Sequence, residues 1–205
     1  MRAVRFRDGE VTVTDVAAVE AGTRVRVTSA GICGSDLHLI SSPGLAPTVT
    51  LGHEIAGVTD DGTPVAVEPV NACGRCRWCE AGDDGLCARA TASLIGIGVD
   101  GGLAERVVVP EHLVVPLPGG VEVRHACLVE PLAVAVRAIA RVGVREGQRV
   151  CVVGAGSIGL AAAVVAMHRG ADVSVVARHE HQAAAAGRLG AASEAGDGFD
   201  VVVEA

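Results

Sequence analysis

Residues 1–30 alternate apolar and polar side chains with a period of two. The alternation is clearest over 3–6, 11–15 and 24–29, with Gly9 and Gly22 between these segments. A period of two is typical of strands with one buried face, and glycines between such segments indicate turns. The opening of the chain therefore predicts an antiparallel, barrel-like β domain. Beyond it, residues 35–40 predict a short helix, and 51–58 and 65–67 predict two further strands.

From residue 129 onward the apolar runs alternate between helical and extended patterns. Helices are predicted at 129–142, 160–169 and 181–189, and strands at 149–153, 172–177 and 199–204. Apolar strands separated by helices indicate a parallel, doubly wound sheet. The chain thus predicts an α/β protein with a β-rich domain over 1–128, a connecting helix over 129–147 and an incomplete nucleotide-binding domain over 148–205.

Composition narrows the class of protein. The 205 residues are 50% apolar, which is enough for one or two packed domains. The net charge is -7 without a basic patch, and the only aromatic rings are Phe6, Trp78 and Phe199. Nucleic acid and membrane partners are therefore not expected, because they need clustered cations, and bases need stacking platforms. No signal peptide or bilayer-spanning run stands out, so we expect a cytoplasmic protein.

Cys33, His53 and Glu54 are the first candidate metal ligands. A thiolate, an imidazole and a carboxylate together suit zinc better than calcium or magnesium. Such a mixed set with an open fourth position is typical of a catalytic zinc. Adjacent side chains on a strand point to opposite faces, so His53 and Glu54 can both bind only if the backbone bends at Gly52. The alternative is that these residues are buried filler without a metal.

Ser35 and His38 lie three residues apart on the predicted helix and share a face. A proton could pass from the Ser35 hydroxyl outward through the His38 imidazole. The alternative is that Ser35 only caps the helix.

A cluster of four cysteines lies in a loop rich in glycine, aspartate and arginine. Its members, spaced C-x2-C-x2-C-x7-C, are Cys73, Cys76, Cys79 and Cys87. Four thiolates at these spacings predict a closed structural zinc site. The alternative, a pair of disulfides, is disfavoured because the chain shows no signal peptide and three-residue spacing gives poor pairing geometry. Cys127 and Cys151 are expected to be packing residues.

A glycine-rich turn joins the strand at 149–153 to the next helix. Its candidate cofactor contacts are Gly154, Gly156, Ser157, Ile158 and Gly159. A G-x-G-x-x-G turn between a strand and a helix is the dinucleotide-binding pattern, in which the pyrophosphate reaches the helix amino terminus. The turn therefore predicts a dinucleotide cofactor.

The position expected to read the adenosine ribose carries Arg178 instead of a carboxylate. Nothing there repels a 2′-phosphate, and the guanidinium can hold it through paired hydrogen bonds. We therefore expect NADP as the preferred cofactor. The alternative is that Arg178 only stacks on adenine and that either NADP or NAD binds.

Several of these motifs, in this order, resemble the zinc-dependent medium-chain alcohol dehydrogenases. They are Gly-Ile-Cys-Gly-Ser-Asp-Leu-His at 31–38, Gly-His-Glu at 52–54, the four-cysteine loop and Gly-Gly-Leu-Ala-Glu-Arg-Val-Val-Val-Pro at 101–110. The resemblance implies a GroES-like catalytic domain followed by a Rossmann domain. It also implies that Cys33 and His53 hold the catalytic zinc, that Asp36 orients His53, and that Ser35 and His38 relay the substrate proton.

The run Leu-Val-Glu-Pro-Leu-Ala at 128–133 resembles the branch that contains polyol, sugar and threonine dehydrogenases. In that branch a glutamate at the position of Glu130 approaches the zinc directly or through water. Glu130 and Glu54 are therefore competing candidates for the remaining place near the metal. A complete doubly wound sheet would need further strands, so the resemblance implies the amino-terminal part of a longer enzyme whose full-length form is a homo-oligomer.

Together these expectations describe a zinc-dependent dehydrogenase that transfers a hydride between a secondary alcohol or polyol and NADP, with one catalytic and one structural zinc. The alternative is a zinc-binding, non-catalytic remnant or partner module. A zinc-free quinone reductase is disfavoured, because that branch lacks both ligand sets.

Overall fold

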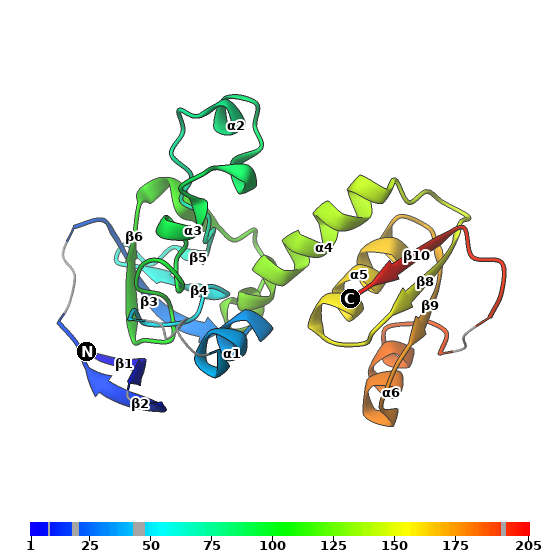
Figure 1. Cartoon of the computed structure of the whole chain (residues 1–205), viewed down its shortest axis with the longest axis horizontal. Helices are drawn as coiled ribbons and strands as arrows, with labels where there is room; N and C mark the ends of the chain where they lie inside the picture. Colours follow the sequence, from blue (N-terminus) through cyan, green and yellow to red (C-terminus); the bar gives the residue numbers. More distant parts are fainter. Residues whose placement is uncertain (8, 18–20, 43–47, 194–195) are drawn as a thin grey trace. The chain divides into compact units, whose positions relative to one another are not determined.

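The computed structural model describes residues 1–7, 9–17, 21–42, 48–193 and 196–205 (Figure 1). The chain divides into two compact units, Met1–Glu130 and Pro131–Ala205. Within the described ranges, no helix has the length and apolar character needed to cross a membrane.

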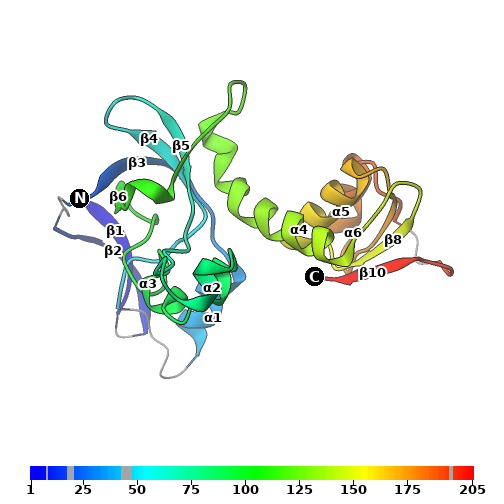
Figure 2. The same cartoon turned by 90° about the horizontal axis from the view of Figure 1, so that it is seen from above.

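Antiparallel strands build the first unit. β1 (Arg2–Arg7) and β2 (Glu10–Asp15) form a separate hairpin. A five-stranded sheet, visible in Figures 1 and 2, has the order β6-β3-β4-β5-β7 and comprises β3 (Thr23–Ala30), β4 (Ile55–Thr59), β5 (Pro64–Val67), β6 (Arg106–Val109) and β7 (Val114–Pro116). Its buried cluster is rich in β-branched side chains such as Val25, Ile55 and Val65, which pack well on a pleated surface. The predicted β-rich, antiparallel first part is confirmed.

Residues 51–58 do not form the single strand that their apolar pattern predicts. β4 begins only at Ile55. Residues 50–52 pair instead with a distant segment, because the backbone N–H groups of residues 101–103 donate to their carbonyl oxygens over 2.8 to 2.9 Å. Gly52 has φ +93°, a conformation that favours glycine, and provides the bend. The strand prediction was wrong at its start because local periodicity carries no information about this pairing.

Short helices join the strands of the first unit. α1 (Gly34–Ser41) confirms the helix predicted at 35–40 and extends it by one residue at each end. The four-cysteine loop contains α2 (Arg77–Glu80), η1 (Asp84–Leu86) and α3 (Ala90–Ser93), and Figure 1 shows the part around α2 standing away from the strands. η2 (Glu111–Leu113) precedes β7, and η3 (Val123–Leu128) leads into α4 (Val129–Val142).

The second unit is a parallel sheet with connecting helices. β8 (Arg149–Val153) lies between β9 (Asp172–Val176) and β10 (Val201–Glu204), and α5 (Ser157–His168) and α6 (Glu180–Arg188) follow β8 and β9. Ala192 forms an isolated parallel bridge with Ser174 on the other side of β9. The order Ala192-β9-β8-β10 is the 3-2-1-4 part of the doubly wound sheet. The predicted incomplete Rossmann architecture is confirmed.

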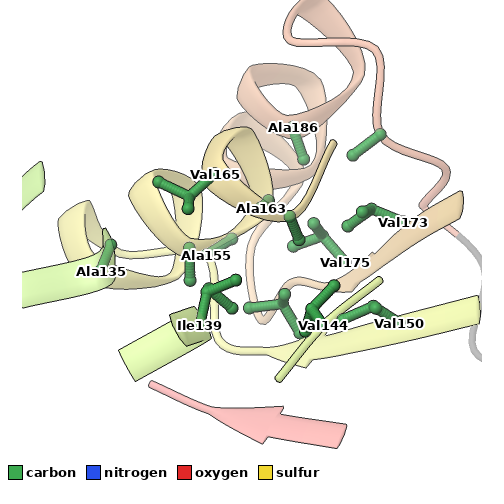
Figure 3. Packing of buried hydrophobic residues seen from close by; sticks show 14 residues of the cluster. Ala135, Ile139, Val144, Val150, Ala155, Ala163, Val165, Val173, Val175 and Ala186 are labelled. Carbon is green, nitrogen blue, oxygen red and sulfur yellow. The ribbon is translucent and has the colours of Figure 1, made fainter. Parts of the chain in front are cut away.

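A core of small and β-branched side chains holds the second unit together. Figure 3 shows these residues gathered in one cluster, contributed by both strands and helices. Val150, Ala163 and Val175 are fully buried, as is Ile139 of α4. Alanines such as Ala162 and Ala163 let α5 approach the sheet closely, and this fixes the amino terminus of α5 at the end of β8.

Candidate metal and cofactor sites

The structure brings Cys33, His53 and Glu54 together. One ligand atom from each residue lies within 4.8 Å of the others. Cys33 follows β3 and the other two residues precede β4, so the pairing of these strands brings the three side chains to one place. His53 and Glu54 are only 7% and 8% exposed. Buried polar groups of this kind need a partner, and a cation between them would provide one.

Asp36 links two of these residues. Its Oδ2 accepts the backbone N–H of Cys33 at 2.9 Å, and its Oδ1 lies 3.7 Å from Nδ1 of His53. Within the described chain, neither this Oδ1 nor this Nδ1 has a hydrogen-bond partner. A carboxylate that faces Nδ1 leaves Nε2 for a metal, which is the usual arrangement around a metal-bound histidine. The donor set and the orphaned buried atoms therefore fit a zinc ion.

The Glu54 side chain occupies space that Gly31 leaves free. The Gly31 N–H donates to the Glu54 carbonyl oxygen at 2.9 Å, and a Cβ at Gly31 would overlap the Glu54 carboxylate. Burial raises the pKa of Glu54; nearby His53 opposes this effect and Asp36 reinforces it. A bound cation would favour the ionised carboxylate instead, because opposite charge stabilises it.

Glu130 lies at the start of α4 and is half-buried. Burial raises its pKa, His53 lowers it and Glu54 raises it further, so its carboxylate is near enough to both residues to interact electrostatically. Among the described residues, however, the compact cluster consists of Cys33, His53 and Glu54 without Glu130. In this geometry Glu54 brings a carboxylate oxygen within 4.8 Å of both the thiol and the imidazole.

Ser35 and His38 both lie on α1. The cap of this helix is Cys33 and the helix starts at Gly34, so Ser35 lies inside it and does not cap it. The Ser35 hydroxyl is buried and has no hydrogen-bond partner in the part of the chain described. His38 is exposed, and its Nε2 lies 3.5 Å from the Ser42 hydroxyl. The serine is thus an inner hydroxyl and the histidine an outer imidazole on one helix.

The four-cysteine loop also converges on one point. Ligand atoms of Cys73, Cys76, Cys79 and Cys87 all lie within 4.8 Å of one another. The Sγ atoms of Cys76 and Cys79 are 3.4 Å apart, and all four cysteines are free thiols. The Cys79 backbone N–H lowers the pKa of Cys76 to about 6, whereas desolvation and the neighbouring Cys76 thiol raise the pKa of Cys79 to about 12. Four sulfurs at this separation fit a closed tetrahedral zinc.

The glycine-rich turn leaves open space at the amino terminus of α5. Gly154 has φ +109°, and a Cβ at Gly159 would overlap the Gly154 carbonyl oxygen. A Cβ at Gly156 would meet nothing within 4 Å, so open space lies at the amino terminus of α5. Ser157 and Ile158 are the first residues of this helix. Free N–H groups and the helix dipole at such a terminus favour phosphate, so the turn fits a dinucleotide.

Arg178 follows β9 and is exposed. No ion pair is found for it within the described ranges. The next residue, His179, precedes α6, and its ring stacks on His181 with the ring centroids 5.5 Å apart. The guanidinium is therefore not committed to an acidic side chain of the described chain.

The sequence motifs give no direct signal for two features of the metal site. One is the space at Gly31, and the other is the pairing of residues 50–52 with 101–103. The clustered glycines offered a partial signal, since a Cβ at Gly96 or Gly101 would overlap the Gly52 carbonyl oxygen. Glycines that a sequence concentrates around a candidate ligand can therefore mark close backbone packing.

Comparison with known proteins agrees with this architecture. Residues 20–119 match the alcohol dehydrogenase GroES-like domain. The L-galactonate-5-dehydrogenase of Escherichia coli K12 is 38% identical over 175 residues, which cover 78% of this chain and 51% of that protein. A second similar protein, from Sinorhizobium meliloti 1021, is described as a zinc-binding dehydrogenase and was solved bound to NADP. Its structure matches with a TM-score of 0.84 at 31% identity, and the match covers 99% of this chain and 61% of that protein's chain.

The alcohol dehydrogenase TADH from Thermus sp. ATN1 matches 100% of this chain and 70% of its own length, with a TM-score of 0.86 and 31% identity. The chain spans about half the length of the curated relatives it matches. Along the chain, the GroES-like domain comes first and the partial Rossmann sheet second, and the similarity to these proteins extends over both. The chain belongs to the zinc-dependent medium-chain alcohol dehydrogenase family.

Proposed function

We propose that the protein is a zinc-dependent dehydrogenase that interconverts a secondary alcohol or polyol and its ketone by hydride exchange with NADP. The observation that carries this proposal is the meeting of Cys33, His53 and Glu54 within 4.8 Å. One thiol, one imidazole and one carboxylate suit a zinc ion that keeps a position for substrate. Zinc bound there supplies Lewis-acid polarisation of the substrate oxygen. The L-galactonate dehydrogenase among the relatives supports a polyhydroxylated substrate.

The residues around this cluster take separate roles. Asp36 holds His53 in the orientation that presents Nε2, because its Oδ1 faces Nδ1. Ser35 accepts the proton that the substrate hydroxyl loses and releases its own hydroxyl proton towards His38, since this hydroxyl is buried and unpartnered within the described chain. His38, exposed on the same helix, passes this proton to solvent. Glu54 holds the third position, and Glu130 is its competitor for that position.

The second unit holds the cofactor in this proposal. Gly156 and the amino terminus of α5 receive the diphosphate, and Arg178 holds the 2′-phosphate that distinguishes NADP from NAD. A relative from Sinorhizobium meliloti was solved bound to NADP, which supports the view that this fold can accommodate the 2′-phosphate. The four cysteines hold a second zinc that has no open position and organises their loop.

The decisive test combines a metal count with a turnover assay. We expect two zinc ions per purified chain, and reduction of NADP with at least one compound in a panel of secondary alcohols and polyols. Cys33→Ser should remove one zinc and the turnover, whereas Cys127→Ser, a half-buried cysteine outside both clusters, should change neither. Two zinc ions without turnover on any substrate would favour the alternative, a zinc-binding module without catalysis.

Cofactor choice has its own test. Arg178→Ala should raise the Kd for NADP by roughly 10-fold or more and leave the Kd for NAD nearly unchanged, because a charge-assisted hydrogen bond contributes about 1.5–3 kcal/mol. Equilibrium titrations monitored by fluorescence would measure both dissociation constants. Tighter binding of NAD than NADP by the unsubstituted chain would contradict the assignment of Arg178.

A further inference from the structure

Arg5, on β1, connects the N-terminal hairpin to the segment that precedes His53. Its Nη1 donates to the Thr48 carbonyl oxygen at 2.8 Å, and its Nη2 lies 3.1 Å from Oδ1 of Asp100. The same Oδ1 accepts the backbone N–H of Thr50 at 2.7 Å. One guanidinium and one carboxylate thus fix the backbone at two positions, 48 and 50, a few residues before His53.

The neighbouring backbone continues this connection. Residues 101–103 donate to the carbonyl oxygens of residues 50–52, so the segment that starts at Asp100 runs directly beside the approach to His53. β1 binds the other side of this segment, since the Val4 N–H donates to the Leu103 carbonyl oxygen at 2.8 Å. Residues 100–103 are therefore held between β1 and residues 50–52.

The burial of Arg5 indicates that these contacts do more to position the backbone than to raise the free energy of unfolding. The Arg5 side chain is only 14% exposed, and its Nε is buried without a hydrogen-bond partner in the described part of the chain. An incompletely satisfied buried cation costs free energy. Asp100 is 47% exposed, so the ion pair itself contributes little. Burying Arg5 therefore costs free energy that its ion pair with Asp100 offsets only in part. What these contacts fix is the backbone that leads to His53.

We propose that Arg5 and Asp100 are positioning residues of the Cys33–His53–Glu54 site, which hold residues 48–52 so that His53 faces Cys33 and Asp36. The inference rests on the metal site of the proposed function. A metal site requires ligand distances within about 0.2 Å of their preferred values, so a small shift of residues 50–52 would weaken binding. The four-cysteine site lies in another loop and should not respond.

Cobalt titration tests this directly, because the intensity of thiolate-to-cobalt absorption separates a site with one thiolate from a site with four. In Arg5→Met and Asp100→Ala, we expect cobalt affinity at the mixed site to fall by about 10-fold or more, as for other residues that orient metal ligands. Affinity at the four-cysteine site should not change. Arg5→Lys, which keeps the positive charge but loses the planar two-nitrogen fork, should fall between Arg5→Met and the unsubstituted chain.

Arg2→Met is the matched control. Arg2 lies on the same strand, and its Nε pairs with Glu105 at 2.9 Å, but it makes no contact with residues 48–50 among the interactions of the described chain. Its cobalt affinities should equal those of the unsubstituted chain. The proposal is overturned if Arg5→Met changes the mixed-site affinity by less than about threefold, or if Arg2→Met weakens it as much, since the effect would then be general loosening of the hairpin.

These outcomes separate this inference from the proposed function. If the unsubstituted chain binds cobalt at two sites and the Arg5 and Asp100 variants bind it with unchanged affinity, the positioning role is overturned. The dehydrogenase proposal would then be unaffected. Weakened mixed-site binding in the Arg5 and Asp100 variants, with no turnover by the unsubstituted chain, supports the positioning role and contradicts the dehydrogenase. A chain that binds cobalt only at the four cysteines overturns both.

Discussion

Gly31 and Gly34 flank Cys33 but have different surroundings. A Cβ at Gly31 would overlap the Glu54 carboxylate, whereas a Cβ at Gly34 would meet nothing within 4 Å. Gly31→Ala should therefore lower the free energy of unfolding by about 1–3 kcal/mol and weaken cobalt binding at the mixed site, because Glu54 must move. Gly34→Ala, at the first residue of α1, should leave stability unchanged or raise it. Urea unfolding and cobalt titration of both variants would measure these effects.

Equal stabilities and equal cobalt affinities for the two alanine variants would contradict this account, because the steric difference between the two positions would then have no consequence. A loss of stability in Gly34→Ala alone would do so as well. Metal-free samples should show the stability difference too, since the overlap with Glu54 does not depend on a bound ion.

Side-chain types could be read from the sequence, but their surroundings could not. Side-chain type and spacing made Cys33, His53 and the four loop cysteines candidate ligands, and the structure brings these candidates close together. The place of Glu54 against Gly31 was hidden, because it depends on which backbone position of β3 lies opposite β4. Arg5 and Asp100 looked like ordinary charged residues, since their roles arise from a contact across 95 positions of the chain.

At the scale of elements, the turn between β8 and α5 contains two glycines with different surroundings. A Cβ at Gly159 would overlap the Gly154 carbonyl oxygen, which is backbone and cannot move cheaply, whereas Gly156 faces open space. Gly159→Ala should thus lower the free energy of unfolding by about 1–3 kcal/mol. Gly156→Ala should keep stability within about 0.5 kcal/mol yet weaken NADP binding, because its methyl group would occupy the space of the diphosphate.

Thermal unfolding of both variants, with calorimetric titration of NADP, would check this pair. A Gly156→Ala variant that binds NADP as tightly as the unsubstituted chain would contradict the placement of the diphosphate. A fully stable Gly159→Ala variant would contradict the close packing of α5 on the turn.

Elements with long apolar runs were the most predictable. The predicted bounds of α4 and β8 agree with the structure residue for residue. The strand expected at 51–58 began too early, because Gly52 bends the backbone and residues 50–52 pair with 101–103. β6 and β7, four and three residues long, were not predicted as strands. The side of β8 on which β10 lies depends on the crossover connection, which periodicity does not encode.

At the scale of the whole molecule, metal chemistry and the larger alanine–valine core belong to different units. Both ligand clusters lie within Met1–Glu130, and the cluster around Val150 and Ala163 lies within Pro131–Ala205. In the sequence, strand-like patterns give way to alternating helix–strand patterns near residue 129. The two units should therefore respond differently to loss of metal.

Removal of zinc by a strong chelator should loosen the four-cysteine loop first. α2, η1 and α3 contain no buried residue, so this segment has little core apart from Cys87. A metal that fixes such a segment provides much of its folding free energy. Hydrogen exchange measured by mass spectrometry should show peptides over 73–93 losing protection, while peptides from β8, β9 and β10 keep theirs, because that sheet is stabilised by apolar burial.

Cys79→Ser should reproduce the effect in the presence of zinc, and Cys151→Ala, in the core of the second unit, should show the reverse pattern. Protection lost equally in both regions on chelation would mean that the metal stabilises the chain as a whole, and would contradict the assignment of a local structural role to the four cysteines.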